Sequence, residues 1–255
     1  MHPRLHVFGV PVSALTFNEA LSTIDTWIVR QERHYVCTLD VHALMEGKAH
    51  PDVREIYRSA AMVTPDGMPL VWLLRHSGYR AADRICGPDL MPAVFRVSQM
   101  RGYRHFLYGS SEETLSRLEG NLDHEFPGVL IVGRYSPPFR PLTLEEQGEV
   151  VRLVNSADPD IVWVGLGAPK QDRWMAAHRA ALKAPVLIGV GAAFDMLAGN
   201  VTRAPLFLRQ TGLEWLYRML QEPRRLAKRY LESNSKFALL IIGEKLGLTR
   251  HQADV

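Results

Sequence analysis

The sequence has little cysteine and no long hydrophobic run. Its 255 residues include only two cysteines, Cys37 and Cys86, which are far apart and form no CxxC pair. They predict neither a disulfide framework nor a zinc site, as is typical of a reducing cytoplasm. The longest apolar run, 237–242, is far shorter than the roughly 20 residues that span a bilayer. Because the first residues also lack the apolar core of a signal peptide, we expect a protein that is neither secreted nor transmembrane.

Signatures of several enzyme classes are missing too. The segment HVFGVPV, which we predict as the first strand, contains no GxGxxG, and this disfavours a nucleotide-dependent oxidoreductase. The ten histidines form no HExxH or HxH set, so we expect His42 and His178 to be hydrogen-bonded polar residues rather than metal ligands. We expect no DxD pair to hold a divalent ion against a diphosphate, and there is no GxSxG elbow. We predict neither a metal site nor a cofactor.

Positive charge is concentrated near the C-terminus. The whole chain has a formal net charge of +3, whereas residues 200–230 contain seven Lys or Arg and two Glu, a local net charge of +5. Such a cluster favours anionic partners, namely phosphates, an acidic membrane surface or nucleic acid, although a solvated helix face is the simpler interpretation. Arg218, Arg225 and Arg229 recur at helical spacing and are interleaved with Trp, Tyr and Leu. This pattern suits a membrane surface or a diphosphate better than plain solvation.

Apolar, β-rich runs alternate with helical patterns through most of the chain. Strand-like runs include HYVCTLD, RHFLYGS, VLIVGRYS and DIVWVGLG, and helical patterns such as SEETLSRLEGNLDHEF lie between them. Continuous apolar strands separated by helices predict an α/β fold with a Rossmann-like, mostly parallel sheet and helices on both faces. The alternation stops near residue 200. We therefore predict an α/β core over 1–200 and a basic, helical C-terminal appendage over 201–255.

Ligands of such sheets bind beyond the carboxyl ends of the strands, and polar residues gather there in this sequence. The most informative stretch is GLGAPKQDRW, residues 165–174. Its glycines alone indicate only a tight turn. Pro169, however, suits a helix start, so that Lys170, Gln171 and Asp172 would lie in an opening turn whose free N–H groups and dipole favour phosphate oxygens. We interpret the stretch as an anion site.

Three aspartates at strand ends are open to two interpretations. Asp66, in the turn sequence TPDG, taken alone is better explained as a cap of a helix that starts near Met68. Asp40, in TLDVHAL, has the same two interpretations. Asp195, in GAAFDMLAG, follows a buried-looking strand, where a carboxylate is costly unless it has a partner.

Taken together, the motifs resemble the WecG/TagA/CpsF glycosyltransferase family. The resemblance runs from about Thr38 to Tyr230. It rests on TPDGMPLVW, RICGPDL, YSPPF, DPDIVWVGLGAPKQDRW, IGVGAAFD, RAP and GLEWLYRMLQEPRRLAKRY. It implies transfer of a sugar from a UDP-sugar to a sugar carried on a polyprenyl diphosphate, in the assembly of bacterial surface polysaccharide. It also implies a cytoplasmic protein attached peripherally to the anionic inner membrane.

Matching positions of the family motifs imply roles for individual residues. Asp66 corresponds to the catalytic base and Thr38 to a residue of the donor pocket, and we assign both to catalysis. Arg84 and Gln171 would face the sugar or the diphosphate, Asp195 the nucleoside, and the appendage would close over the site. The full substrate-binding set is Asp40, Arg84, Tyr135, Gly167, Lys170, Gln171, Asp195, Arg218 and Arg225. Many family members have Asn where this chain has Asp40, so the sugar specificity stays open.

The chemistry that this assignment requires is coherent. A carboxylate at a strand end can take the proton of a sugar hydroxyl as the hydroxyl attacks the anomeric carbon, and direct displacement inverts that carbon. Arginines and helix N-termini would neutralise the departing diphosphate, so we expect metal independence. The main alternative is a noncatalytic nucleotide-sugar binding module that recruits other enzymes to the membrane. The basic cluster carries no recognised nucleic-acid motif, so we expect no nucleic-acid partner, and a homo-oligomer stays open.

Overall fold

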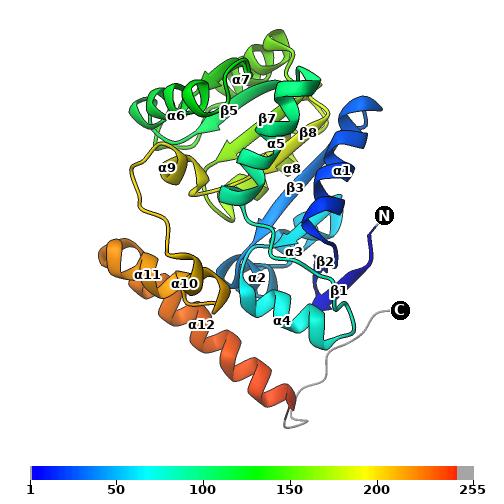
Figure 1. Ribbon diagram of the computed structural model, residues 1–255, viewed down its shortest axis with the longest axis vertical. Helices are drawn as coiled ribbons and strands as arrows, with labels where there is room; N and C mark the ends of the chain where they lie inside the picture. The colour runs from blue at the N-terminus through cyan, green and yellow to red at the C-terminus, as the bar shows by residue number, and fades with distance from the viewer. Residues whose placement is uncertain (1, 246–255) are drawn as a thin grey trace. The chain divides into compact units, whose positions relative to one another are not determined.

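The computed structural model describes residues 2–245 and has the predicted α/β fold (Figure 1). The strands are β1 (Arg4–Val7), β2 (Val10–Ser13), β3 (His34–Leu39), β4 (Met62–Pro65), β5 (Arg104–Gly109), β6 (Leu130–Tyr135), β7 (Ile161–Gly165) and β8 (Val186–Gly189). The six-stranded sheet has the order β4-β3-β8-β7-β5-β6, and the strand pairs from β3 to β6 are parallel. The prediction of a mostly parallel, Rossmann-like sheet is confirmed.

Helices alternate with these strands and then follow one another after β8. They are α1 (Phe17–Val29), α2 (Val41–Ala49), α3 (Pro51–Ser59), α4 (Met68–His76), α5 (Gly87–Arg101), α6 (Glu112–Glu125), α7 (Leu144–Ala157), α8 (Lys170–His178), α9 (Ala193–Leu197), α10 (Leu206–Gln210), α11 (Glu214–Gln221) and α12 (Pro223–Lys245). The described part of the predicted appendage, residues 201–245, thus contains three helices, of which α12 is the longest, and residues 246–255 lie outside the described residues.

The expected first strand, HVFGVPV, is in fact a hairpin. β1 and β2 form a separate antiparallel pair in which Val7 faces Val10. The two residues between them, Phe8 and Gly9, both have positive φ angles, 53° and 81°. Tight hairpin turns of this kind need positive φ at both central residues, because their twist then matches that of the strands. The expectation of one strand is therefore wrong, because the chain reverses at Phe8 and Gly9.

The chain divides into two compact units. Of the described residues, the first unit contains 2–17, 39–85 and 203–245, and the second contains 18–38 and 86–202. The C-terminal helices thus belong to the same unit as the N-terminal hairpin, α2, α3 and α4. Within the first unit α12 packs against α2 and α11, and the ring of Phe237 contacts that of Phe8 edge to face.

A stripe along α12 explains this packing. Leu226, Tyr230, Ser233 and Phe237 are buried, and their spacing of three or four residues places them on one face of the helix. Burying a large apolar side chain contributes about 1.5–3 kcal/mol, so this stripe anchors α12. On other faces of the helix Leu231, Leu239 and Ile242 are exposed.

The second unit has a core of fully apolar strands. Phe106, Trp163 and Ile188, from β5, β7 and β8, have no exposed side-chain surface. Helices α6 and α7 contact β6, and α8 contacts β7 and β8. Gly109, which ends β5, has a φ of +120°, and a Cβ atom there would lie 2.7 Å from the carbonyl oxygen of Gly165. The carboxyl ends of β5 and β7 therefore require glycine to approach this closely.

Candidate active site

Asp66 occupies the turn between β4 and α4. Its backbone N–H donates to the carbonyl of Leu39 (3.0 Å), which holds the turn beside the end of β3. The N-cap of α4 is Gly67, and no side chain caps this helix. The interpretation of Asp66 as a cap is therefore wrong, because the helix begins one residue later than a cap at Asp66 would require. The Asp66 carboxylate therefore caps no helix.

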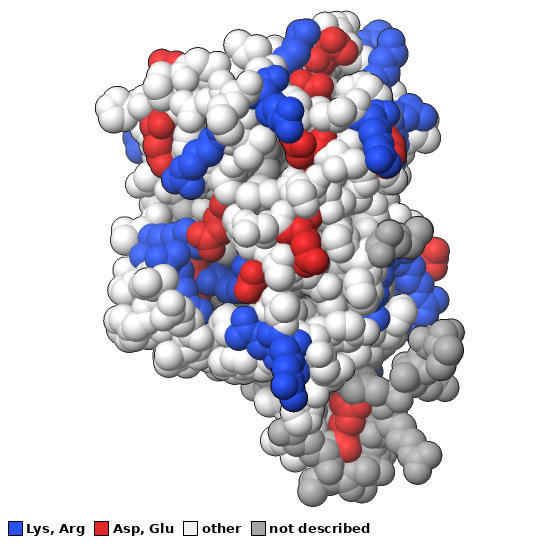
Figure 2. Space-filling view, turned by 45° about the vertical axis from the view of Figure 1, so that its right-hand side comes forward, with Lys and Arg blue, Asp and Glu red and all other residues white. Residues whose placement is uncertain are grey.

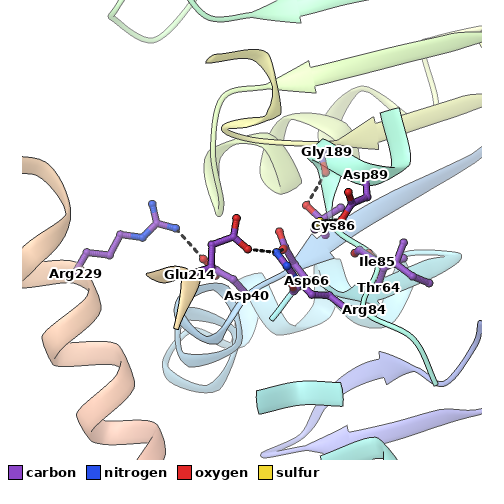
Figure 3. A network of polar contacts seen from close by, with 11 residues as sticks. Asp40, Thr64, Asp66, Arg84, Ile85, Cys86, Asp89, Gly189, Glu214 and Arg229 are labelled. Atoms are coloured by element: carbon purple, nitrogen blue, oxygen red, sulfur yellow. Dashed lines mark hydrogen bonds and ion pairs between the residues drawn. The ribbon is translucent and has the colours of Figure 1, made fainter. Parts of the chain in front are cut away.

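Arg84 is held beside Asp66 by the extended segment that precedes α5. Ile85 N–H donates to the carbonyl of Pro65 (2.9 Å), and the Thr64 hydroxyl donates to the carbonyl of Ile85 (2.9 Å). Through this pairing Arg84 Nε donates to the backbone carbonyl of Asp66. The guanidinium lies between two carboxylates, with Nη2 3.5 Å from Asp66 Oδ1 and 2.5 Å from Glu214 Oε2 (Figure 3).

The environment of Asp66 disfavours its ionised form. Burial is the largest cause, and the carboxylates of Asp40 and Glu214 act in the same direction, against the opposing charges of Arg84 and Arg218. Together they raise the pKa of Asp66 from 3.8 to about 6. A carboxyl group with a pKa just below neutrality is ionised at pH 7 and is a stronger base than an ordinary aspartate.

Asp40 caps α2 and also binds an arginine of α12. Its Oδ1 accepts a hydrogen bond from Ala43 N–H (2.7 Å), which confirms the capping interpretation. Its Oδ2 lies 3.4 Å from Arg229 Nη2 (Figure 3). Nearby, His42 Nδ1 lies 2.9 Å from the Ser233 hydroxyl, as expected for a hydrogen-bonded histidine, and burial lowers the pKa of His42.

The predicted arginine pattern spans two helices rather than one. Arg218 lies on α11, whereas Arg225 and Arg229 lie on α12, and Glu222 ends α11 with a non-helical backbone. Glu222 Oε2 lies 2.7 Å from Arg225 Nη2 and 3.9 Å from Arg218 Nη2. Arg218 Nε is buried and has no hydrogen-bond partner among residues 2–245. The helical spacing of the arginines therefore does not correspond to one continuous face.

Gln171 organises the glycine loops of the second unit. The prediction that Lys170, Gln171 and Asp172 form the opening turn of a helix is confirmed by α8. Gln171 is buried, and its Oε1 accepts hydrogen bonds from the N–H groups of Gly167 (3.1 Å) and Gly191 (2.9 Å). One side chain therefore joins the loops that follow β7 and β8.

The remaining predicted residues of the second unit differ in their surroundings. Thr38 is buried, and its hydroxyl donates to the carbonyl of Gly189 (2.8 Å) across β3 and β8. Tyr135 ends β6, and its ring stacks on that of Tyr108 at 5.8 Å. Lys170 is exposed, and Asp195, on α9, is half-buried. Their roles in substrate binding stay predictions.

The expectation that the sequence has no DxD pair is wrong, since it contains Asp158–Pro159–Asp160, which lies at the amino end of β7. Asp160 Oδ2 accepts a hydrogen bond from Arg104 N–H (2.8 Å), and Asp158 Oδ2 lies 3.4 Å from Arg104 Nη1. These carboxylates hold the amino ends of β7 and β5 together. We expect the ligand at the opposite, carboxyl ends of the strands. In residues 2–245, no group of three or more His, Cys, Asp or Glu side chains is arranged to hold a metal ion.

Sequence reasoning missed two residues of the first unit. Glu214, the first residue of α11, binds Arg84 as described above. Tyr230 packs its ring against Trp215 at 6.2 Å, and burial raises its pKa. The available signal for Glu214 was its isolation, since it is one of two acids in a strongly basic segment.

Charge on the visible surface is mixed. Figure 2 shows Lys and Arg side chains beside Asp and Glu side chains over much of the face drawn. Apolar side chains are exposed as well, and on α10 and α11 they include Leu206, Phe207, Leu216 and Leu220. In the described part of the chain, no helix combines the length and apolar character needed to cross a bilayer.

Comparison with known proteins confirms the resemblance. A family model described as "Glycosyl transferase WecG/TagA/CpsF family" matches residues 5–251. Two similar proteins are both named N-acetylglucosaminyldiphosphoundecaprenol N-acetyl-beta-D-mannosaminyltransferase. The one from Bacillus subtilis (strain 168) is 29% identical over 232 residues, 88% of each chain. The one from Staphylococcus aureus (strain MW2) is 24% identical over 227 residues, 88% of this chain and 87% of the other. The chain therefore belongs to the WecG/TagA/CpsF family of glycosyltransferases.

Proposed function

We propose that the protein transfers a sugar from a UDP-sugar to a sugar on a polyprenyl diphosphate, with Asp66 as the general base. The observation that carries this proposal is the Asp66 carboxylate, which caps no helix and has a pKa near 6. A general base works best when its pKa lies near the working pH, so this carboxylate suits removal of a proton from a hydroxyl.

The reaction is a single displacement. The acceptor hydroxyl oxygen attacks the anomeric carbon of the donor sugar while its proton moves to an Asp66 oxygen. The bond between the anomeric carbon and the diphosphate oxygen breaks, and UDP leaves with the bonding electron pair. Attack opposite to the leaving group inverts the anomeric carbon. Asp66 then releases its proton to solvent.

Arginines of the first unit are our candidates for neutralising the departing diphosphate. Arg84 and Arg218 both act electrostatically on Asp66, which places their charges close to the base. Arg218 is largely buried, with 17% of its side chain exposed, and its Nε has no partner within residues 2–245. A fixed guanidinium in a water-poor setting stabilises developing charge more strongly than a solvated one. Arg225 is more exposed, and we infer a supporting role for it.

We infer that two features of the second unit suit the binding of a nucleotide. The Gln171 side chain fixes the loops of Gly167 and Gly191, and α8 begins with Lys170 in its first turn, a setting that favours phosphate oxygens. The half-buried ring of Tyr135 ends a row of stacked rings with Tyr108 and Trp174, so it is a rigid platform for an aromatic base. The Thr38 hydroxyl donates to the carbonyl of Gly189, so Thr38 would position the ends of β3 and β8.

We also propose that the protein docks at a membrane surface, because a polyprenyl diphosphate acceptor stays in its bilayer. Leu206 and Phe207 of α10 are 58% and 62% exposed, and Lys and Arg residues follow them along the chain. Apolar side chains that enter the headgroup region, together with about 1 kcal/mol for each basic residue near an anionic surface, suffice for peripheral binding.

The sugar and acceptor are tested directly with a panel of UDP-sugars. The names of the relatives make UDP-N-acetylmannosamine and N-acetylglucosaminyl-diphosphoundecaprenol the first pair to try. Release of UDP together with a lipid product heavier by one sugar residue supports the proposal. If the protein binds UDP-sugars but releases no UDP with any lipid-linked sugar, the proposed transfer is wrong.

A further inference from the structure

Four arginines of the first unit are paired with carboxylates of the same unit. Arg84 pairs with Glu214, Arg229 with Asp40, and both Arg218 and Arg225 with Glu222. A diphosphate group needs the same guanidinium N–H groups that these carboxylates occupy. These arginines are therefore already partly neutralised within the protein, and a donor diphosphate must compete for the paired N–H groups.

The contact between Glu214 and Arg84 is the tightest of these pairs. Glu214 Oε2 lies 2.5 Å from Arg84 Nη2, whereas the Asp66 carboxylate is 3.5 Å from the same nitrogen. Both members are well shielded, with 13% of the Glu214 side chain and 16% of the Arg84 side chain exposed. Partial burial strengthens such a pair, because less water screens it than at the surface. Glu214 thus holds Arg84 more closely than the proposed catalytic base does.

The backbone of the first unit presents Glu214 to Arg84. Glu214 is the first residue of α11, where the helix dipole favours a negative charge. The turn before it contains Gly212, whose φ is +73°. A Cβ atom at Gly212 would lie 2.9 Å from the Trp72 ring and 3.3 Å from Met68 Cβ, both on α4. The start of α11 is therefore packed closely against α4.

From this arrangement we propose that Glu214 is a placeholder for the donor diphosphate, which occupies Arg84 in the free protein and is displaced when a UDP-sugar binds. The inference rests on the proposed use of a UDP-sugar. It assigns Glu214 a positioning role, since the carboxylate keeps Arg84 extended and neutralised until a phosphate oxygen replaces it. The Glu214 carboxylate also contributes to the raised pKa of Asp66. Its departure would remove this one cause of the raised pKa at the moment when the donor binds.

The test compares the binding of UDP and of uridine to the full-length protein by calorimetry. If Glu214 holds Arg84 in about nine-tenths of the molecules, removal of this competitor tightens UDP binding about tenfold. We expect Glu214→Gln to show that gain for UDP and unchanged affinity for uridine, which has no phosphate. The matched control is Glu232→Gln. It removes the same charge from an exposed position on α12 and should bind UDP as the wild type does.

The outcomes separate this inference from the proposed function. If the wild type binds no UDP, the proposed function fails. If the wild type binds UDP but Glu214→Gln binds it equally or more weakly while uridine binding is unchanged, the placeholder role is wrong. An equal gain in Glu232→Gln would assign the effect to long-range charge and also overturn the proposal. Should Glu214→Gln not fold, Glu214→Asp shortens the side chain by one methylene, and the same tighter binding of UDP is expected.

As an independent readout, the acid limb of the pH profile of kcat/KM, which reports the free enzyme, should move to lower pH in Glu214→Gln, because the carboxylate that raises the pKa of Asp66 is absent. A group that only supported the local fold would lower kcat without moving this limb. An unmoved limb would therefore contradict the proposed positioning role.

Discussion

Replacing Asp66 by Asn should stabilise the fold at neutral pH even though it abolishes the proposed base. The pKa of Asp66 is raised from 3.8 to about 6 in the folded protein, so the folded state disfavours the ionised carboxylate. A rise of this size corresponds to about 3 kcal/mol. Because 28% of the Asp66 side chain is exposed, we expect a gain of about 1–3 kcal/mol for an amide that cannot ionise.

The pH dependence of this gain follows from the direction of the pKa change. Below about pH 3.8 the carboxyl group is protonated in both states, and the wild type and Asp66→Asn should be equally stable. The destabilisation of the wild type grows as the pH rises through the window from 3.8 to about 6 and is complete above it. Arg84 keeps Glu214 as a partner in the variant, so no buried guanidinium is left unpaired.

Urea unfolding of both proteins at pH 4.5 and pH 7.5 measures the effect, with Asp123→Asn as the control. Asp123 is an exposed carboxylate on α6, and its replacement should leave the unfolding midpoint unchanged at both values. Equal or lower stability of Asp66→Asn at pH 7.5 would refute the reasoning, since Asp66 would then be an ordinary stabilising carboxylate.

Three further predictions follow from the site and the surface. In the wild type, kcat/KM should fall below an acid limb near pH 6, because Asp66 must be ionised to act, and a pH–rate profile flat down to pH 5 would contradict this. Turnover should persist in excess EDTA, since we assign charge neutralisation to arginines, and a loss restored by Mg²⁺ or Mn²⁺ would show this assignment to be wrong. Phe207→Ser should weaken sedimentation with anionic vesicles several-fold, whereas Met100→Ser, at a still more exposed apolar position on α5, should not.

The sheet and the location of the site could be predicted from the sequence because both depend on local patterns. Continuous apolar runs mark buried parallel strands, and the residues that follow them must gather at one edge of the sheet. Asp66 and Gln171 are placed at strand ends in this way, whereas the catalytic role of Asp66 comes from the family resemblance and stays a proposal. The side chains that surround them come from distant parts of the chain, and strand order and helix packing decide which of these meet.

The errors have specific physical causes. Gly9 gave no sign that the chain reverses there, because a glycine within an apolar run is compatible with both a strand and a turn. The turn sequence TPDG favours Asp66 as a cap, but the identity of a cap depends on one residue of helix register. In the structure Gly67 takes that position. Glu214 is separated from Arg84 by 130 residues, and no periodicity in the sequence joins them.

The most direct test of the central claim compares turnover and UDP affinity in the wild type and in Asp66→Asn, with the donor and lipid acceptor that the wild type accepts. Our account predicts that Asp66→Asn lowers kcat by at least about a hundredfold, the usual scale for loss of a general base. It should also leave UDP affinity within about threefold of the wild type. If Asp66→Asn binds UDP and still turns over at a rate close to that of the wild type, Asp66 is not the base and the proposed mechanism is wrong.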